Sequence, residues 1–175
     1  MGVVGIITIV LIILIGGYYI HTVSKLGRLH EMARNAAGEL DTLLWDRNHV
    51  LDQIIKLAED KGLEIPEEYK ESLSLGLGMM PTLQMSVYSK INQRGNAVIA
   101  KVKEDPALAE SDEMKHLCGR FTNLKIDIAD SGSRYNQRAT KFNAYIQSPL
   151  ARILSARKNM REKGHFNIAV AEVTQ

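Results

Sequence analysis

Two aromatic–asparagine pairs, seven residues apart, form the most suggestive polar motif in the chain. Tyr135–Asn136 and Phe142–Asn143 share a spacing that places both rings on one helix face and both amides beside them, with Arg138 between the pairs. One hypothesis is that these side chains line a polar cleft that binds a ligand or signal molecule. The other is that the aromatics fill core layers while the amides and Arg138 make interhelical hydrogen bonds that fix the register. The sequence favours this structural interpretation.

Arg47 is a charged residue in an otherwise apolar stripe. It lies seven residues after Leu40 and seven before Ile54. A buried guanidinium requires a partner, and Asp127 or Asp130 in a later helix are candidates. The alternative is a guanidinium that reaches solvent along its aliphatic stem. Both hypotheses give Arg47 a structural role rather than a catalytic one.

The remaining reactive side chains form no recognisable catalytic or metal-binding motif. His116 and Cys118 lack further ligands at metal spacing, and Cys118, the only cysteine, is expected to be an inert thiol. Gly76-Leu-Gly78 is not followed by the Lys-Ser or Lys-Thr of a phosphate loop. A net charge of +2 gives no reason to expect a nucleic-acid partner. We therefore predict a protein that is not an enzyme and has no cofactor or metal.

Residues 3–20 are predicted to be a transmembrane helix. The run contains no charged side chain, and its eighteen residues give roughly 27 Å of helix, close to the ~30 Å hydrocarbon thickness. A cleaved signal peptide would have a basic N-terminal region and a small-residue cleavage site. Instead, the run ends in Tyr18 and Tyr19, residues typical of a membrane interface. We expect a retained anchor that contacts the bilayer.

The charges next to this anchor predict its orientation. Lys25, Arg28 and Arg34 follow the apolar run closely, and no Lys or Arg precedes it. The positive-inside rule therefore predicts that the N-terminus lies outside and residues 21–175 lie in the cytoplasm. A single cysteine agrees with a reducing compartment.

The chain beyond the anchor is predicted to be all-α. Apolar residues recur at three- and four-residue steps, and Gly62 and two prolines, Pro106 and Pro149, divide the pattern. The first soluble helix is expected to continue directly from the anchor. The expected helices are 3–61, 67–103 with a kink or short break at Gly76, Gly78 and Pro81, 107–147, and 149–163, followed by a loosely ordered tail over 164–175.

The helix over 107–147 has a seven-residue repeat that favours bundle packing. Its repeated positions are Met114, Phe121, Ile128, Tyr135 and Phe142. Such spacing indicates left-handed, coiled-coil-like contacts between helices. The predicted fold is a membrane-tethered antiparallel helical bundle of about four helices.

A basic cluster occurs in the last predicted helix, with apolar residues interleaved. In an up-down bundle, the second helix returns to the membrane and the third leads away, so the last helix would begin at the distal end. A solvated face or a protein contact is therefore expected in preference to contact with lipid headgroups or nucleic acid. The cluster consists of Arg152, Arg157, Lys158, Arg161 and Lys163.

The sequence resembles the LemA family of bacterial membrane proteins. The clearest similarity is Tyr135–Asn136 and Phe142–Asn143 leading into Ile146, Gln147, Ser148, Pro149 and Ala151. Further similarities are Asn35–Ala36, Leu40–Asp41, Leu44, Arg47, Ile54–Ile55, Leu108 after Pro106, and Phe166. Departures are Ala37 at a position that is often tryptophan, Asp52 in place of a proline, and Lys125 at a position that is often acidic.

The resemblance implies an N-out anchor in the bacterial inner membrane and a four-helix cytoplasmic bundle, and it implies no enzymatic activity. The expected domains are residues 1–20 as N-terminus and anchor, 21–163 as the LemA-like bundle, and 164–175 as the tail. We predict an interaction or scaffold protein with protein partners or self-association. The alternative is a ligand or signal sensor that uses the polar cleft around Tyr135, Asn136, Arg138 and Asn143.

Overall fold

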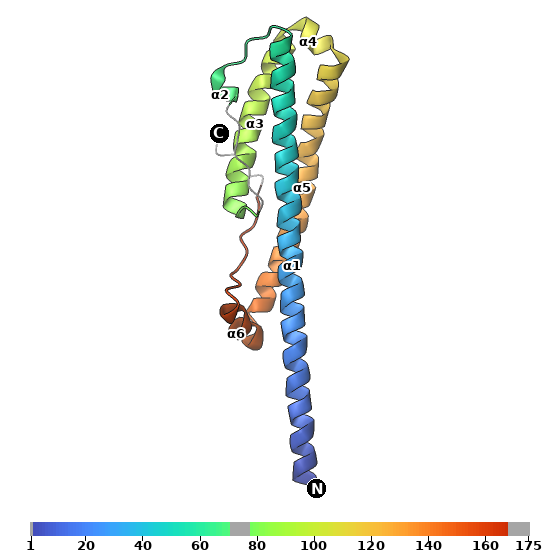
Figure 1. Cartoon of the computed structure of the whole chain (residues 1–175), viewed down its shortest axis with the longest axis vertical. Helices are drawn as coiled ribbons and strands as arrows, with labels where there is room; N and C mark the ends of the chain where they lie inside the picture. The colour runs from blue at the N-terminus through green and yellow to red at the C-terminus, as the bar shows by residue number, and fades with distance from the viewer. Residues whose placement is uncertain (1, 71–77, 168–175) are drawn as a thin grey trace. The chain divides into compact units, whose positions relative to one another are not determined.

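The computed structural model describes residues 2–70 and 78–167, and within these ranges all regular structure is helical, as predicted. No strand occurs in these two ranges. Three helices are long and three are short (Figure 1). They are α1 (Val3–Asp60), α2 (Glu67–Lys70), α3 (Pro81–Glu104), α4 (Pro106–Glu110), α5 (Asp112–Ile146) and α6 (Pro149–Arg157).

Helix α1 is a single helix of 58 residues, so the predicted continuity between the apolar run and the first soluble helix is confirmed. It ends at the predicted glycine. Gly62 has a φ of +89°, which L-residues with a Cβ rarely adopt. The Leu63 amide donates to the Ala58 carbonyl (3.0 Å) and the Gly62 amide to that of Glu59 (2.9 Å), the pair of bonds that defines a Schellman cap.

The N-terminal part of α1 is apolar and exposed. It is the one helix in the described part of the chain that is long and apolar enough to cross a membrane, and none of its most apolar stretch is buried by the protein. Thr8, the only serine or threonine of residues 3–20, donates to the Val4 carbonyl one turn earlier (2.9 Å). That bond removes an unsatisfied polar group from the apolar surface. These properties are those of a segment that lipid can surround.

The chain divides into two compact units. Unit 1 consists of Met1–Asn35 and Gln137–Lys163, and unit 2 of Ala36–Asn136 and Gly164–Gln175. Helices α1 and α5 both contribute residues to each unit, whereas α3 belongs to unit 2 and α6 to unit 1.

In unit 2, α3 runs parallel to α1. Asp41 pairs with Gln84 and Arg47 with Asn92, so residue numbers increase together along the two helices. The prediction that the second long helix runs antiparallel to the first is therefore wrong. Periodicity shows which face of a helix is buried but carries no information on the direction of its neighbour. Figure 1 shows α3 and α5 flanking this part of α1.

In unit 1, α5 runs antiparallel to α1, and α6 packs beside both. The ring of His30 lies 5.4 Å from that of Phe142, and Lys25 lies 4.7 Å from the ring of Tyr145. One apolar cluster joins the three helices, and its buried members are Leu26, Phe142, Ile146 and Leu154. Because Leu26 lies only six residues after Ile20, α6 packs close to the C-terminal end of the apolar run. Its predicted position at the distal end is wrong.

The seven-residue repeat of α5 is confirmed as its buried face. The five repeated residues, from Met114 to Phe142, are each at most 2 % exposed. The helix nevertheless starts later than predicted, because the chain breaks at Ser111 between α4 and α5. Asp105 caps α4 by accepting from the Ala107 and Leu108 amides (2.9 and 3.2 Å). Of the predicted break, Gly76 lies outside the described residues, whereas Gly78 has a φ of +79° and α3 begins at Pro81, so the helix is interrupted there.

The predicted last helix, 149–163, is shorter in the structure. Helix α6 ends at Arg157, and the C-cap is completed by Asn159 with a φ of 53°. Residues 160–167 have no regular secondary structure. Within the tail that was predicted to be loosely ordered, Phe166 is 2 % exposed, so its first residues are packed.

Candidate functional site

A buried polar layer in unit 2 surrounds Arg47. This side chain is 2 % exposed, so it does not reach solvent. Its Nη2 donates to Asn92 Oδ1 (2.8 Å), and its guanidinium lies 4.3 Å from the centre of the Phe121 ring and 5.3 Å from that of Tyr88. Two aromatic faces and a neutral amide thus stabilise the charge.

The hydrogen bond described for Arg47 goes to Asn92 of α3 and not to the carboxylates that were predicted as partners. Asp127 and Asp130 are both exposed on α5. Asn92, which is 6 % exposed, accepts a hydrogen bond from Arg47 inside the core. The sequence places Asn92 next to the core residue Ile91, where an amide is easily read as part of the polar face.

Asp41 anchors the start of α3. Its Oδ2 accepts from the amides of Gly78 (2.7 Å) and Met79 (3.3 Å), and its Oδ1 accepts from Gln84 Nε2 (2.6 Å). Asp41 is 2 % exposed and Gln84 is fully buried. Sequence reasoning did not single out Gln84, although it lies seven residues before Ile91 on the core stripe and so could have been found.

Arg94 fixes the end of α2 against α1. Its Nε and Nη2 donate to the Tyr69 carbonyl (3.0 and 2.7 Å), and its Nη1 donates to Asn48 Oδ1 (3.2 Å). Its Nη2 also lies 3.8 Å from a carboxylate oxygen of Asp52. Burial raises the pKa of Asp52, against an opposing effect of the Arg94 charge. Arg94 thus connects α3 to α2 through Tyr69 and to α1 through Asn48 and Asp52.

The two asparagines of the aromatic–asparagine motif bind the protein backbone. In unit 1, Asn143 Nδ2 donates to the Lys163 carbonyl and Asn143 Oδ1 accepts from the Lys163 amide, both at 2.8 Å. In unit 2, Asn136 makes the same pair of bonds to Phe166, both at 2.7 Å. Each side-chain amide thus satisfies both backbone groups of one residue, as a neighbouring β-strand would.

The other residues of the motif are also structural. The buried Tyr135 hydroxyl donates to the Gly164 carbonyl (2.8 Å), and burial raises the pKa of Tyr135. Phe142 is fully buried in the apolar cluster of unit 1. Arg138 donates to the Met32 carbonyl on α1 at a long 3.4 Å. The structural interpretation holds for the aromatics, but the asparagines bind the C-terminal segment and not another helix.

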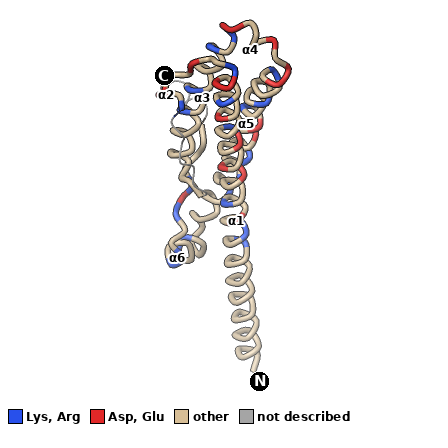
Figure 2. Tube along the Cα trace, turned by 45° about the horizontal axis from the view of Figure 1, so that its top comes forward, with Lys and Arg blue, Asp and Glu red and all other residues tan. Residues whose placement is uncertain are grey.

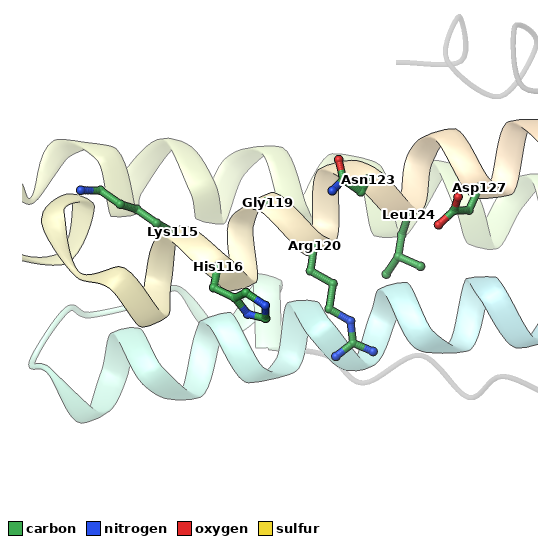
Figure 3. A pocket seen from close by; sticks show the side chains of 7 residues that line it. All are labelled: Lys115, His116, Gly119, Arg120, Asn123, Leu124 and Asp127. Carbon is green, nitrogen blue, oxygen red and sulfur yellow. The ribbon is translucent and has the colours of Figure 1, made fainter.

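A shallow depression on α5 was not predicted. It encloses about 450 Å³ and lies in unit 2 (Figure 3). The side chains of His116 and Arg120 extend from one side of α5, whereas that of Asn123 projects from the other. The polar side chains of the depression are thus spread along and around α5. Its lining is Lys115, His116, Gly119, Arg120, Asn123, Leu124 and Asp127.

Clustered metal ligands and the thiol of Cys118 are further places where chemistry could occur. Within residues 2–70 and 78–167, no group of three or more His, Cys, Asp or Glu side chains is placed to hold a metal ion. Cys118 is partly buried, and this burial raises the pKa of its thiol. A raised pKa lowers the fraction of reactive thiolate at neutral pH.

Exchanging Asn92 should cost more stability than exchanging Arg47. The Asn92→Leu variant keeps the buried Arg47 charge and removes the hydrogen bond that Arg47 Nη2 donates to Asn92, which we expect to cost about 2–3 kcal/mol. The Arg47→Leu variant removes the charge together with its desolvation cost, so we expect a smaller loss. Chemical denaturation in detergent measures both, and the double variant should lose less than the sum. A larger loss for Arg47→Leu would contradict this account.

His30 should make unit 1 less stable at mildly acidic pH. Its Nδ1 is buried without a hydrogen-bond partner among the described residues. Burial, together with the positive charges of Lys163 and Arg34, lowers the pKa of His30 against the opposing effect of Glu31. Below about pH 6.5 the unfolded chain therefore binds the proton more readily than the folded one, so the free energy of unfolding falls as pH falls.

Thermal unfolding between about pH 8 and about pH 5.5 measures this effect. We expect His30→Gln to reduce the drop in Tm on acidification. The matched control is His116→Gln, which changes an exposed histidine of α5 and should leave the drop in place. An equal drop in the two variants would exclude His30 as its source.

Comparisons of the chain with protein-family models, with curated proteins and with solved structures gave no significant match in any of the three. The likeness to the LemA family therefore rests on the sequence motifs alone.

Proposed function

We propose that this chain is a LemA-like, single-pass protein of the bacterial inner membrane. Its N-terminus would lie outside, and its helical bundle would act in the cytoplasm as a non-enzymatic interaction or scaffold module. The observation that supports this most is the exposed apolar surface of residues 3–20, on the same helix that enters both units. Exposing so much apolar surface to water would be costly, and a bilayer removes that cost.

The charge pattern supports the proposed side of the membrane. Lys25, Arg28 and Arg34 are the first charged groups after the apolar run other than Glu31, and Tyr18 and Tyr19 mark the boundary. Both tyrosines are exposed on α1, as residues at a lipid–water interface would be. The positive-inside rule assigns the side that follows these residues to the cytoplasm.

The bundle has surface features suited to a protein partner. Trp45 is 53 % exposed on α1 and stacks on His49, with ring centroids 5.2 Å apart. Ile126 is 61 % exposed on α5. Tryptophan is enriched among the interface residues that contribute most to binding energies. Partners or a second copy of the chain would contact such residues.

The alternative of a ligand sensor is less well supported. The groups that it needs, in Tyr135, Asn136 and Asn143, already bind the backbone of residues 163–166. A ligand would have to displace this segment before it could reach them.

Crosslinking in cells, with the tether intact, tests the proposal. We expect a defined set of crosslinked proteins, or crosslinked copies of the chain, that persists when residues 3–20 are exchanged for another transmembrane helix of the same orientation. Deleting residues 3–20 should remove them, because the bundle leaves the membrane. Trp45→Ala should weaken the crosslinks, whereas Lys61→Ala, at an exposed charged residue of the same unit, serves as a control. Repeated failure to recover any partner would contradict an interaction role.

A further inference from the structure

The charges of the chain are segregated between its two units. Unit 1 contains ten Lys and Arg residues but only two acidic ones, Glu31 and Glu162, and so carries a net charge of +8. Unit 2 contains the remaining twelve basic and eighteen acidic residues, a net charge of −6. The near-neutral total of +2 conceals this separation. The strongly basic unit is the one that includes the apolar run (Figure 2).

Helix α6 brings part of this charge close to the end of the apolar run. Its buried Leu154 packs in the same cluster as Leu26 of α1. Six residues separate Leu26 from Ile20, which corresponds to about 9 Å along α1. The polar headgroup layer extends about 5–7 Å beyond the hydrocarbon, and the Debye length at physiological salt is about 8 Å. Charges on α6 are therefore within electrostatic reach of lipid headgroups.

The exposed face of α6 has the composition of a membrane-surface helix. Ala151, Leu154 and Ser155 are buried, whereas Arg152, Ile153 and Arg157 are exposed. Ile153 is 55 % exposed between two arginines, one residue before and one turn after it. Among the described residues, no ion pair engages Arg152, Arg157 or Lys158. A cationic face with an exposed aliphatic side chain is typical of helices that lie on anionic bilayers.

A second group of basic side chains lies on α1 and α5, close to Leu26 along α1. Lys25 and Lys141 line an open depression of about 420 Å³ together with the apolar and aromatic side chains of Leu29 and Tyr145. Lys25 follows Ile20 by five residues, about 7.5 Å along the helix. The Lys25 ammonium lies 4.7 Å from the centre of the Tyr145 ring, and with Lys141 beside the same depression the two positive charges suit the phosphate of a lipid headgroup.

We infer that unit 1 binds anionic phospholipid headgroups through Arg152, Arg157 and Lys158 of α6, with Ile153 entering the interface, and through Lys25 and Lys141. This inference rests on the proposed membrane anchor. The inference adds two properties to that anchor, namely a preference for anionic lipid and a bundle docked on the bilayer surface. A bilayer surrounds α1 on all sides, so both basic features meet headgroups.

The test uses the full chain in proteoliposomes, with a fluorescent label on a single cysteine. Cys118→Ser removes the native thiol, and Ala156→Cys places the label on the exposed face of α6. Lipids that carry a quencher on the headgroup report contact of the label with the bilayer. The vesicles contain either phosphatidylcholine alone or phosphatidylcholine mixed with phosphatidylglycerol. We expect much stronger quenching in the anionic vesicles, lost when salt rises from about 0.05 to about 0.5 M.

Charge removal should abolish the preference. Each basic group near an anionic surface changes the ratio of docked to undocked states by about fivefold. The triple variant Arg152→Gln, Arg157→Gln, Lys158→Gln should therefore lower that ratio by about a hundredfold. The matched control, Lys61→Gln, Lys90→Gln, Lys103→Gln, neutralises three exposed lysines of unit 2 and should behave as the unmodified chain.

Flotation of the vesicles separates this inference from the anchor itself. A chain that floats with both vesicle types but shows equal quenching in both keeps its anchor and overturns the inference. Quenching that the triple variant leaves unchanged, or a label that responds to added oligonucleotide and not to phosphatidylglycerol, also overturns it. Failure to float with either vesicle type would instead overturn the anchor. Circular dichroism of each variant confirms that its helices are retained.

Discussion

Gly95→Ala is expected to destabilise the protein by about 3 kcal/mol or more, an effect at the upper end for overpacking. A Cβ atom at Gly95 would lie 2.1 Å from Phe121 Cζ and 2.6 Å from Phe121 Cε1, so the ring would have to move. The displaced ring is also one of the two aromatic faces that contact Arg47. The substitution therefore disturbs packing and the buried charge together. Chemical denaturation in detergent measures the loss.

A second glycine provides the matched control for Gly95→Ala. Gly119 lies in the interior of α5, is exposed, and has no atom within 4 Å of its would-be Cβ. Gly119→Ala should stabilise the protein by about 0.5–1 kcal/mol, because alanine restricts the unfolded chain more than glycine does. Adding Phe121→Leu to Gly95→Ala should recover part of the loss, since it removes the overlapping ring. A mild Gly95→Ala effect with no rescue would contradict the close packing of α3 on α5.

Phe166→Ala is expected to cost about 3 kcal/mol and to release the segment that follows α6. Phe166 is 2 % exposed, and its ring makes an edge contact with Tyr88, with ring centroids 6.2 Å apart. Its backbone amide and carbonyl are both bound by Asn136. Loss of the ring removes the apolar anchor that holds these bonds in place. Denaturation measures the loss, and faster tryptic cleavage after Lys163 reports the release.

A substitution at Gly132 tests whether the Phe166 ring packs against α5, separately from a general loss of stability. A Cβ atom at Gly132 would lie 2.5 Å from Phe166 Cδ1. Gly132→Ala should therefore loosen the same segment, and it should cost little once Phe166→Ala is present. Asn136→Ala should speed the same cleavage with a smaller loss of stability, about 1–2 kcal/mol. Additive effects of Gly132→Ala and Phe166→Ala would show that the two residues do not touch.

The helices and their buried faces were predictable because local residues determine them. Gly62 ends α1 through its positive φ, Pro149 begins α6, and the repeat from Met114 to Phe142 is the buried face of α5. Arg47 was correctly identified as an unusual core residue. One further contact could have been predicted from α3. Gly95 lies seven residues after Tyr88 and seven before Val102, on the buried face, where a small residue predicts the close approach of a large one.

Other features depend on contacts between distant parts of the chain. The parallel direction of α3 is set by pairings such as Asp41 with Gln84, which periodicity cannot specify. The same error placed the basic residues of α6 far from the apolar run. The sequence also did not predict that Asn143 binds the backbone of Lys163 and that Asn136 binds that of Phe166. An extended segment held by side chains has no repeating pattern.

Cysteine accessibility in intact cells tests the central claim most directly. In a Cys118→Ser background, Gly2→Cys and Gln53→Cys place single thiols on the two sides of the proposed span. We predict that a membrane-impermeant maleimide labels Gly2→Cys in intact cells and Gln53→Cys only after the cells are opened, with both chains retained in membranes after alkaline carbonate extraction. Labelling of Gln53→Cys in intact cells, or release of either chain by carbonate, would contradict a retained anchor with its bundle in the cytoplasm.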